Sequence, residues 1–190
     1  MEQVSDIVLF QRIRQDDRLA LNTLFANYYQ QLCRFACSCS LSHEEAEEVV
    51  ADVFFTLWKN RERLEVHSNM RAYLYKCVRN SALATLRTVN PEVAYATEHD
   101  VADEVTPQLK LEYDELQQEL NRIVDKLPAR CRQIFVMNRF DGLKYKEISL
   151  ALGLSEKTIE HQMVKALEIV RTAITIHRSQ TSLHKSVTVS

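Results

Sequence analysis

Glycine and proline are scarce in this chain, which has two glycines and three prolines among its 190 residues. Sheet-rich and doubly wound folds need many tight turns, and tight turns depend on these two residue types. The same scarcity leaves little room for the glycine-rich loops that cradle phosphates, and no G-x-S-x-G or H-E-x-x-H pattern occurs. The composition therefore predicts an all-α protein, and we find no constellation of residues that indicates an enzyme.

Long apolar runs and a secretory leader are also missing. No apolar stretch approaches the ~20 residues that cross a bilayer, and the N-terminal stretch has no basic leader with an apolar core. We therefore expect a cytoplasmic protein. An odd number of cysteines, spread over expected helices, fits reduced thiols in that compartment. Three of them lie near His43 without a paired C-x-x-C spacing, so we expect small buried side chains and neither a metal nor a cofactor. The cysteines are Cys33, Cys37, Cys39, Cys77 and Cys131.

Charge is distributed unevenly, although the formal net charge is only -2. Residues 59–87 hold seven Lys or Arg against two acidic residues, and residues 126–171 hold nine against five. An acidic helix with Glu44, Glu45, Glu47, Glu48 and Asp52 precedes the first basic block. Distribution matters more than net charge for binding nucleic acid. The pattern suggests two nucleic-acid contacts and one surface for a basic partner.

Apolar residues recur at three- and four-residue steps along most of the chain, as in amphipathic helices. This periodicity fades between Thr88 and Gln108, where five acidic residues occur without Lys or Arg. We interpret that stretch as a flexible linker between two small helical domains. The expected organisation is a first domain at 1–88, a linker at 89–109, a second domain at 110–178 and a disordered tail at 179–190. The expected helices are 6–14, 16–39, 43–58, 70–87, 109–127, 129–140, 145–152 and 156–171.

A helix-turn-helix pattern spans residues 142–171. The first helix places Ile148 and Leu152 on one side, Gly153 can leave it at positive φ, and Ser155 can cap the second helix. Polar side chains cluster at the start of that second helix, where this motif presents groups to base edges in the major groove. An ordinary αα-hairpin with a solvated face is the alternative. The candidate DNA-contacting residues are Ser155, Lys157, Thr158, His161, Gln162 and Lys165.

The expected helix at 70–87 carries a second set of candidates. Its outward positions combine cationic groups that bind phosphates with an aromatic ring that can stack on unpaired bases. This mixture favours contact with single-stranded or duplex DNA. The candidates, with the residue that precedes the helix, are Asn69, Arg71, Tyr75, Lys76, Arg79 and Asn80.

The order and spacing of three stretches resemble the extracytoplasmic-function (group 4) sigma factors of bacterial RNA polymerase. These stretches are AEEVVADVFFTLWKNRERL (46–64), NMRAYLYKCVRNSALATLR (69–87) and LPARCRQIFVMNRFDGLKYKEISLALGLSEKTIEHQMVKALEIVR (127–171). Members of that family keep two helical domains, regions 2 and 4, joined by a flexible linker. The resemblance covers nearly the whole chain.

The resemblance implies a role for each surface. The helix at 156–171 would read the -35 element as duplex DNA, and the helix starting at Met70 would capture bases of the melted -10 element. The acidic helix would dock on the clamp helices of core polymerase. An anti-sigma factor, often membrane-anchored in this family, is a further implied partner, and no small-molecule substrate is implied. The core-binding candidates are Glu48, Asp52, Phe55 and Trp58. A stand-alone helix-turn-helix regulator that binds a duplex operator is the alternative function.

Overall fold

The structure is a computed structural model that describes residues 5–66, 69–89 and 121–187, with side chains described to Thr175. Within these ranges the chain forms helices and no strand, as the composition predicted. Most of the predicted linker, residues 90–109, lies outside the described residues. The helices described from end to end are α1 (Asp6–Arg14), α2 (Arg18–Ser38), α3 (His43–Lys59), α4 (Met70–Val89), α7 (Ala129–Phe135), η1 (Val136–Phe140), α8 (Tyr145–Leu152) and α9 (Glu156–Val187). Residues 121–125 are helical as well.

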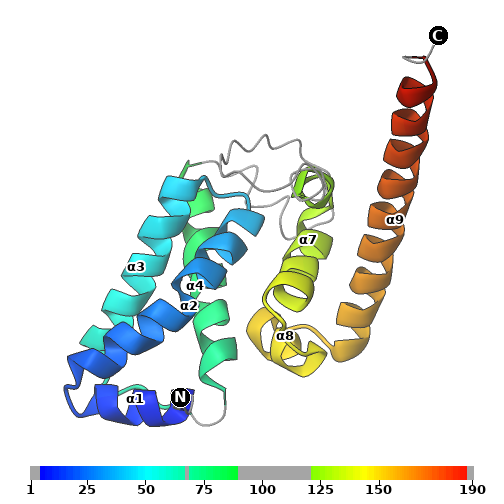
Figure 1. Ribbon diagram of the computed structural model, residues 1–190. Coiled ribbons are helices and arrows are strands. Elements are labelled where there is room, and N and C mark those ends of the chain that lie inside the picture. Colours follow the sequence, from blue (N-terminus) through cyan, green and yellow to red (C-terminus); the bar gives the residue numbers. More distant parts are fainter. Residues whose placement is uncertain (1–4, 67–68, 90–120, 188–190) are drawn as a thin grey trace.

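The helices form two units, which lie side by side in Figure 1. The first unit (residues 5–89) contains α1 to α4, and the second unit (residues 121–187) contains α7, η1, α8 and α9. Helix α9 continues to Val187, so the helix extends through most of the stretch expected to be a disordered tail. No helix in the described ranges is long and apolar enough to cross a membrane.

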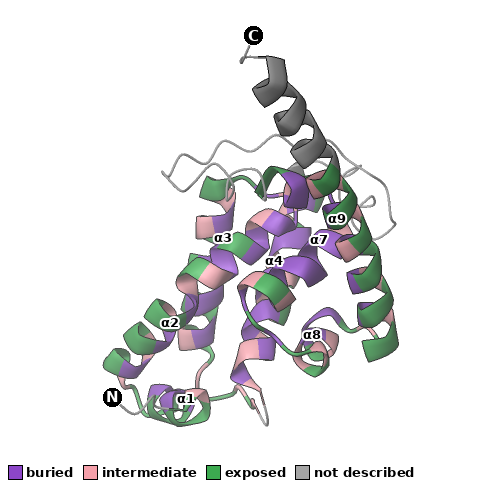
Figure 2. Ribbon diagram, turned by 45° about the vertical axis from the view of Figure 1, so that its right-hand side comes forward, coloured by how far each residue is buried: buried purple, intermediate pink, exposed green. Residues whose placement is uncertain are grey.

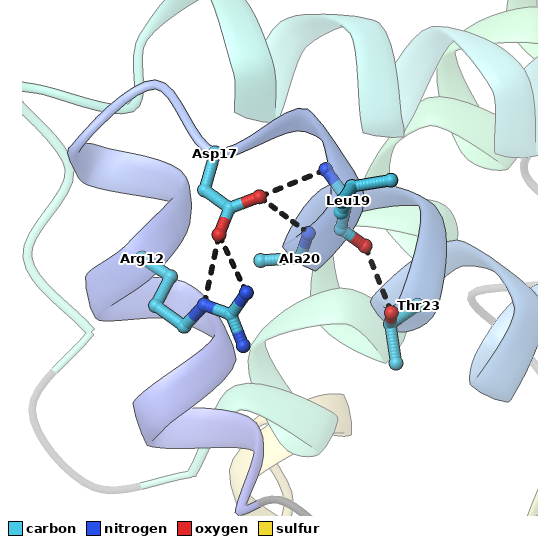
Figure 3. Close-up of polar contacts among 5 residues, drawn as sticks. All are labelled: Arg12, Asp17, Leu19, Ala20 and Thr23. Atoms are coloured by element: carbon cyan, nitrogen blue, oxygen red, sulfur yellow. Dashed lines mark hydrogen bonds and ion pairs between the residues drawn. The ribbon is translucent and has the colours of Figure 1, made fainter.

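Side-chain caps fix where the helices of the first unit begin. One carboxylate oxygen of Asp17 accepts hydrogen bonds from the backbone N–H groups of Leu19 (2.9 Å) and Ala20 (3.1 Å), at the start of α2 (Figure 3). Its other oxygen accepts a hydrogen bond from Arg12 Nε at 2.8 Å. The Ala20 N–H and the Arg12 guanidinium hold the pKa of Asp17 below its ordinary value. This carboxylate therefore joins the end of α1 to the start of α2.

The cap predicted for α3 is confirmed. Ser42 Oγ accepts a hydrogen bond from the Glu45 N–H at 3.3 Å, and the Glu45 carboxylate accepts one from the Ser42 N–H at 2.8 Å. This reciprocal capping box satisfies two backbone donors that the helix cannot pair internally. It fixes the residue at which α3 begins.

The predicted helix-turn-helix is present in the second unit. Gly153 ends α8 at φ 68°, in the left-handed region that costs glycine no Cβ clash. Ser149 Oγ donates a hydrogen bond to the Leu154 carbonyl at 2.6 Å, which closes the turn. Ser155 Oγ accepts one from the Thr158 N–H at 3.1 Å and caps α9. The turn residues identified in the sequence therefore have the expected roles.

The helix expected at 129–140 changes type before it ends. It is α-helical through Phe135, and residues 136–140 form a π-helical turn. The Asp141 N–H donates to the Val136 carbonyl, five residues back, at 3.1 Å. Gly142 then turns the chain at φ 69°. Such π-turns are rare and often occur at functional sites; this one fixes the position of Asp141.

The two units share one core, in which α4 packs against α2 and α3 of its own unit and against α8 of the second, while α2 contacts α7 and η1 (Figure 2). Leu24, Phe35 and Leu74 are fully buried in the first unit, and Ile134 and Ile148 are fully buried in the second. The amphipathic pattern predicted this burial within each unit. The pattern gave no indication that the two units would pack against each other.

Candidate nucleic-acid and polymerase interfaces

The second helix of the helix-turn-helix presents the first set of predicted DNA-contacting residues. Ile159, Met163 and Ala166 point into the core, so the opposite side of α9 is left to solvent. Lys157, His161 and Lys165 are exposed there and line a shallow depression together with Glu160, Val164 and Glu168. Cationic and hydrogen-bonding groups on an exposed helix face are what major-groove recognition requires.

Two members of this set are held by neighbours. Thr158 is half-buried, and its hydroxyl lies 2.8 Å from Ser155 Oγ, so both hydroxyls take part in the cap. Gln162 is also half-buried, and its Oε1 accepts a hydrogen bond from Cys131 Sγ of α7 at 2.9 Å. The carbonyl end of this side chain therefore points toward α7.

The second predicted set lies on α4, and the structure divides it. Lys76 and Asn80 are exposed, as expected, and Arg79 is half-buried. Asn69 caps α4 by accepting a hydrogen bond from the Ala72 N–H at 2.8 Å, and its amide donates to Glu147 at 3.1 Å. Asn69 is therefore engaged in contacts with both units.

The prediction that Tyr75 faces outward was wrong. Its side chain is fully buried, and its ring lies 5.0 Å from the Phe35 ring of α2. Its hydroxyl donates a hydrogen bond to Asp141 Oδ2 of the second unit at 2.8 Å. Burial, together with the nearby Asp141 carboxylate, raises the pKa of Tyr75. In this conformation the ring cannot stack on a base.

Arg71 is also engaged with the second unit. Its guanidinium donates hydrogen bonds to the Asp141 carbonyl and, at 3.3 Å, to Gln31 of α2. It lies one helical turn before Tyr75, so both side chains are on the same face of α4. That face carries the predicted readers Arg71 and Tyr75, and the second unit covers it.

Asp141 is a buried carboxylate at the centre of this contact. Burial raises its pKa to about 6, against the opposing effects of the Tyr75 hydroxyl and the guanidinium groups of Arg34 and Arg71. Burial would also raise the pKa of Glu147, but the Lys144 N–H, Asn69 and Arg71 outweigh it and leave that pKa below its ordinary value. The pKa values of the two carboxyl groups in this contact are therefore shifted in opposite directions, that of Asp141 upward and that of Glu147 downward.

The predicted polymerase-binding residues form a continuous stripe on α3. Glu48, Asp52 and Phe55 are exposed at steps of four and three residues, and 65% of the Phe55 surface is accessible. Trp58 extends the stripe by three more residues and is half-buried, with the Arg61 guanidinium 4.5 Å from its ring centre. An exposed aromatic ring among carboxylates suits a partner surface that is both basic and apolar.

Three of the five cysteines are buried, namely Cys33, Cys39 and Cys131. Within the described ranges, no three His, Cys, Asp or Glu side chains are grouped so that they could hold a metal ion. Burial raises the pKa of Cys33 to about 11 and that of Cys39 to about 12, so both stay protonated thiols at neutral pH. Protonated thiols are poor metal ligands and poor nucleophiles.

Sequence reasoning missed four residues that define the contact between the units. Arg34 lies 3.8 Å from the Asp141 carboxylate, and Arg132 donates a hydrogen bond to Ser40 Oγ at 3.2 Å. Asp141 and Glu147 of the second unit complete the contact, since they bind Tyr75 and Asn69. A signal was present for Arg132, because it lies at an inward helical position where a cation needs a partner.

Comparison with family models identifies both units. Residues 24–90 match the model for sigma-70 region 2, and residues 117–169 match the model for sigma-70 region 4. The two matches follow each other in the order that the sequence predicted. Together they cover more than half of the chain.

Similar proteins agree with this result over nearly their full lengths. The ECF RNA polymerase sigma-E factor of Haemophilus influenzae is 24% identical over 184 residues, covering 91% of this chain and 97% of that protein. The sigma-E factor of Escherichia coli is 24% identical, with 89% and 94% covered. RNA polymerase sigma factor NccH of Alcaligenes xylosoxydans xylosoxydans is 25% identical, with 85% and 90% covered.

Solved structures show the same fold. CnrH, in complex with the cytosolic domain of CnrY, superposes with a TM-score of 0.60 at 19% identity, covering 90% of this chain and 97% of CnrH. The sigma factor RpoE of Bartonella quintana, in complex with the anti-sigma factor NepR, gives a TM-score of 0.62 at 21% identity, with 82% and 96% covered.

Proposed function

The chain belongs to the sigma-70 family, as an RNA polymerase sigma factor of the extracytoplasmic-function type, and we propose that its two units divide promoter recognition between them. The second unit reads the -35 element through α9, and the first unit captures the -10 element through α4. The observation that carries this proposal is the order of the two regional matches, combined with an exposed polar face on α9.

The -35 contact has the chemistry of a helix-turn-helix. Lys157 and Lys165 bind phosphates or guanine edges, and His161 contacts a base or the backbone between them. The -10 contact uses Lys76, Arg79 and Asn80, which are at least partly accessible, and Asn69, Arg71 and Tyr75 once the second unit has moved away. The protein carries no catalytic step of its own; it positions core polymerase and holds the melted strand.

The partners follow from the same assignment. Core polymerase docks its clamp helices on the α3 stripe, where carboxylates and Phe55 face solvent. An anti-sigma factor is a second partner, supported by the two solved relatives, one bound to the cytosolic domain of CnrY and the other to the anti-sigma factor NepR. Such a factor holds the chain inactive until a signal arrives. A protein with these two partners is expected to act in the cytoplasm.

Transcription in vitro tests the function directly. Core polymerase is expected to start at defined sites only when this chain is added, and sequencing of the transcripts maps both promoter elements. A stand-alone regulator would instead shift duplex DNA by itself and leave the start sites of core polymerase unchanged.

Replacing Lys157 with alanine is expected to weaken binding of holoenzyme to -35 duplex DNA. The loss of one phosphate or base contact should weaken binding by about 1–3 kcal/mol. The slope of the logarithm of the binding constant against the logarithm of salt concentration should also fall in magnitude by about one. Fluorescence anisotropy across a salt series measures both quantities. Lys126→Ala is the matched control, because Lys126 is exposed in the same unit but lies before α7. Equal losses in the two variants would exclude a specific role for α9.

Reversing the charge of Asp52 is expected to weaken core association by at least about tenfold, because an arginine would meet a basic partner surface. Glu62→Arg makes the same change in net charge at an exposed position outside α3 and should have little effect. Surface plasmon resonance with immobilised core polymerase measures both variants. Unchanged binding of Asp52→Arg would place the polymerase contact elsewhere.

A further inference from the structure

Two carboxylates interrupt the cationic face of α9. The shallow depression on this helix is lined by Glu160 and Glu168 as well as by the cationic groups of Lys157 and Lys165. Both glutamates are exposed, so neither helps to fill the core. A negative charge is repelled by DNA phosphates, so a glutamate that enters the groove needs a donor on the DNA to offset that repulsion.

The two glutamates differ in their position along the helix. Helix α9 begins at Glu156, so Glu160 lies in its second turn and Glu168 lies about two turns further on. A recognition helix contacts base edges with its N-terminal residues. At about 1.5 Å per residue, Glu168 is about 12 Å beyond Glu160 along the helix axis. Glu160 is therefore the carboxylate that can reach base edges.

The surroundings of Glu160 leave its carboxylate able to accept hydrogen bonds from DNA. Among the residues that the structure describes, no ion pair or side-chain hydrogen bond engages it. Val164 lies one helical turn later, is 51% exposed and lines the same depression. An apolar side chain at this place displaces water beside the carboxylate when DNA binds, and a carboxylate without a donor then loses hydration without replacement. A base that offers no donor to Glu160 is therefore costly.

Cytosine is the base whose major-groove edge best suits a carboxylate. It presents the N4 amino group as a donor and no acceptor. Adenine presents its N6 amino group beside the N7 acceptor, and the lone pair of N7 repels the second carboxylate oxygen. Guanine presents two acceptors, and thymine presents the O4 acceptor and a methyl group. A carboxylate thus selects cytosine by attraction and disfavours the other bases by repulsion.

We propose that Glu160 is a specificity-determining residue: its carboxylate accepts a hydrogen bond from N4 of one cytosine in the -35 element. This inference rests on the proposed function and deepens it, because it states which base α9 reads at one position. Lys157 and Lys165, before and after Glu160 in the helix, supply phosphate or guanine contacts that offset repulsion between the carboxylate and the DNA backbone. Glu168 takes no part in reading bases.

Selection of promoter DNA by holoenzyme tests the proposal. Core polymerase with the wild-type protein binds a pool of duplexes in which the -35 element of the mapped promoter is randomised, and the bound fraction is sequenced. The wild type is expected to enrich cytosine at one position. Glu160→Gln is expected to lower the preference for cytosine over adenine there by about tenfold, because a glutamine amide can bind adenine N6 and N7 together. Base preferences at the other positions should stay as they are.

Glu168→Gln is the matched control. It removes the same charge from the same depression, and both glutamates are exposed, so each variant keeps the core intact. Both variants are expected to bind DNA of every sequence somewhat more tightly, because each removes one repulsion of the phosphates. Only Glu160→Gln is expected to change the ratio between bases.

Unchanged base preferences in Glu160→Gln, or the same change in both variants, would overturn the proposal and leave Glu160 as a solvated charge. Enrichment of a base other than cytosine at the position that responds to Glu160→Gln would overturn it as well. Failure of the proposed function would look different, because the wild-type holoenzyme would then enrich no -35 element at all.

Discussion

Replacement of Phe35 with alanine is expected to lower the free energy of unfolding by about 3–5 kcal/mol, the usual range for removing a buried aromatic ring. Phe35 is fully buried on α2 and packs against the Tyr75 ring. A cavity there removes apolar contacts and also loosens the side chain that binds Asp141. The expected loss is a large share of the stability of a small helical unit.

Urea denaturation followed by tryptophan fluorescence measures this loss, because Trp58 is the single tryptophan and lies on α3 of the same unit. Leu19→Ala is the control, since 72% of the Leu19 surface is accessible and little apolar area is lost there. Similar midpoints for the two variants would mean that the Phe35 side chain is not packed as described.

Replacement of Asp141 with asparagine is expected to stabilise the folded chain at pH 8 and to leave its stability nearly unchanged at pH 4. The pKa of this carboxyl rises from an ordinary 3.8 to about 6 on burial, so the folded state favours the protonated form. The contribution of the Asp141 carboxyl to the free energy of unfolding of the wild type is therefore fully present below about pH 4. It is lost as the pH rises through about 6. The loss approaches about 3 kcal/mol, at about 1.4 kcal/mol per pH unit.

Asparagine keeps an acceptor for the Tyr75 hydroxyl but cannot ionise, so it avoids this loss. The charged and titratable groups that face Asp141 are Tyr75 and Arg71 from α4 and Arg34 from α2. The Tyr75 hydroxyl stays protonated over this pH range because its pKa is raised. The difference in unfolding free energy between Asp141→Asn and wild type, measured by urea denaturation at each pH, thus isolates one group. A difference that stays constant from pH 4 to 8 would contradict the assignment.

Several features of this protein followed from local sequence. Few glycines and prolines predicted helices, the Ser42–Glu45 spacing predicted the capping box, and Gly153 with Ser155 predicted the turn between α8 and α9. Each depends on residues within about four positions of one another, so the sequence contains the whole interaction. The exposed polar face of α9 could also be predicted from local sequence, because the apolar stripe of this helix packs on a single core.

The face of α4 that carries Arg71 and Tyr75 was decided by tertiary structure. Helical spacing placed these residues together, but spacing cannot tell whether a face meets solvent or another unit. The partner of Tyr75 is Asp141, which is 66 positions away in the sequence. A π-helical turn and Gly142 place that carboxylate. Local patterns therefore determined the helices and their caps, whereas burial of the reader depended on a long-range contact between polar groups, which leave no periodic signal in either segment.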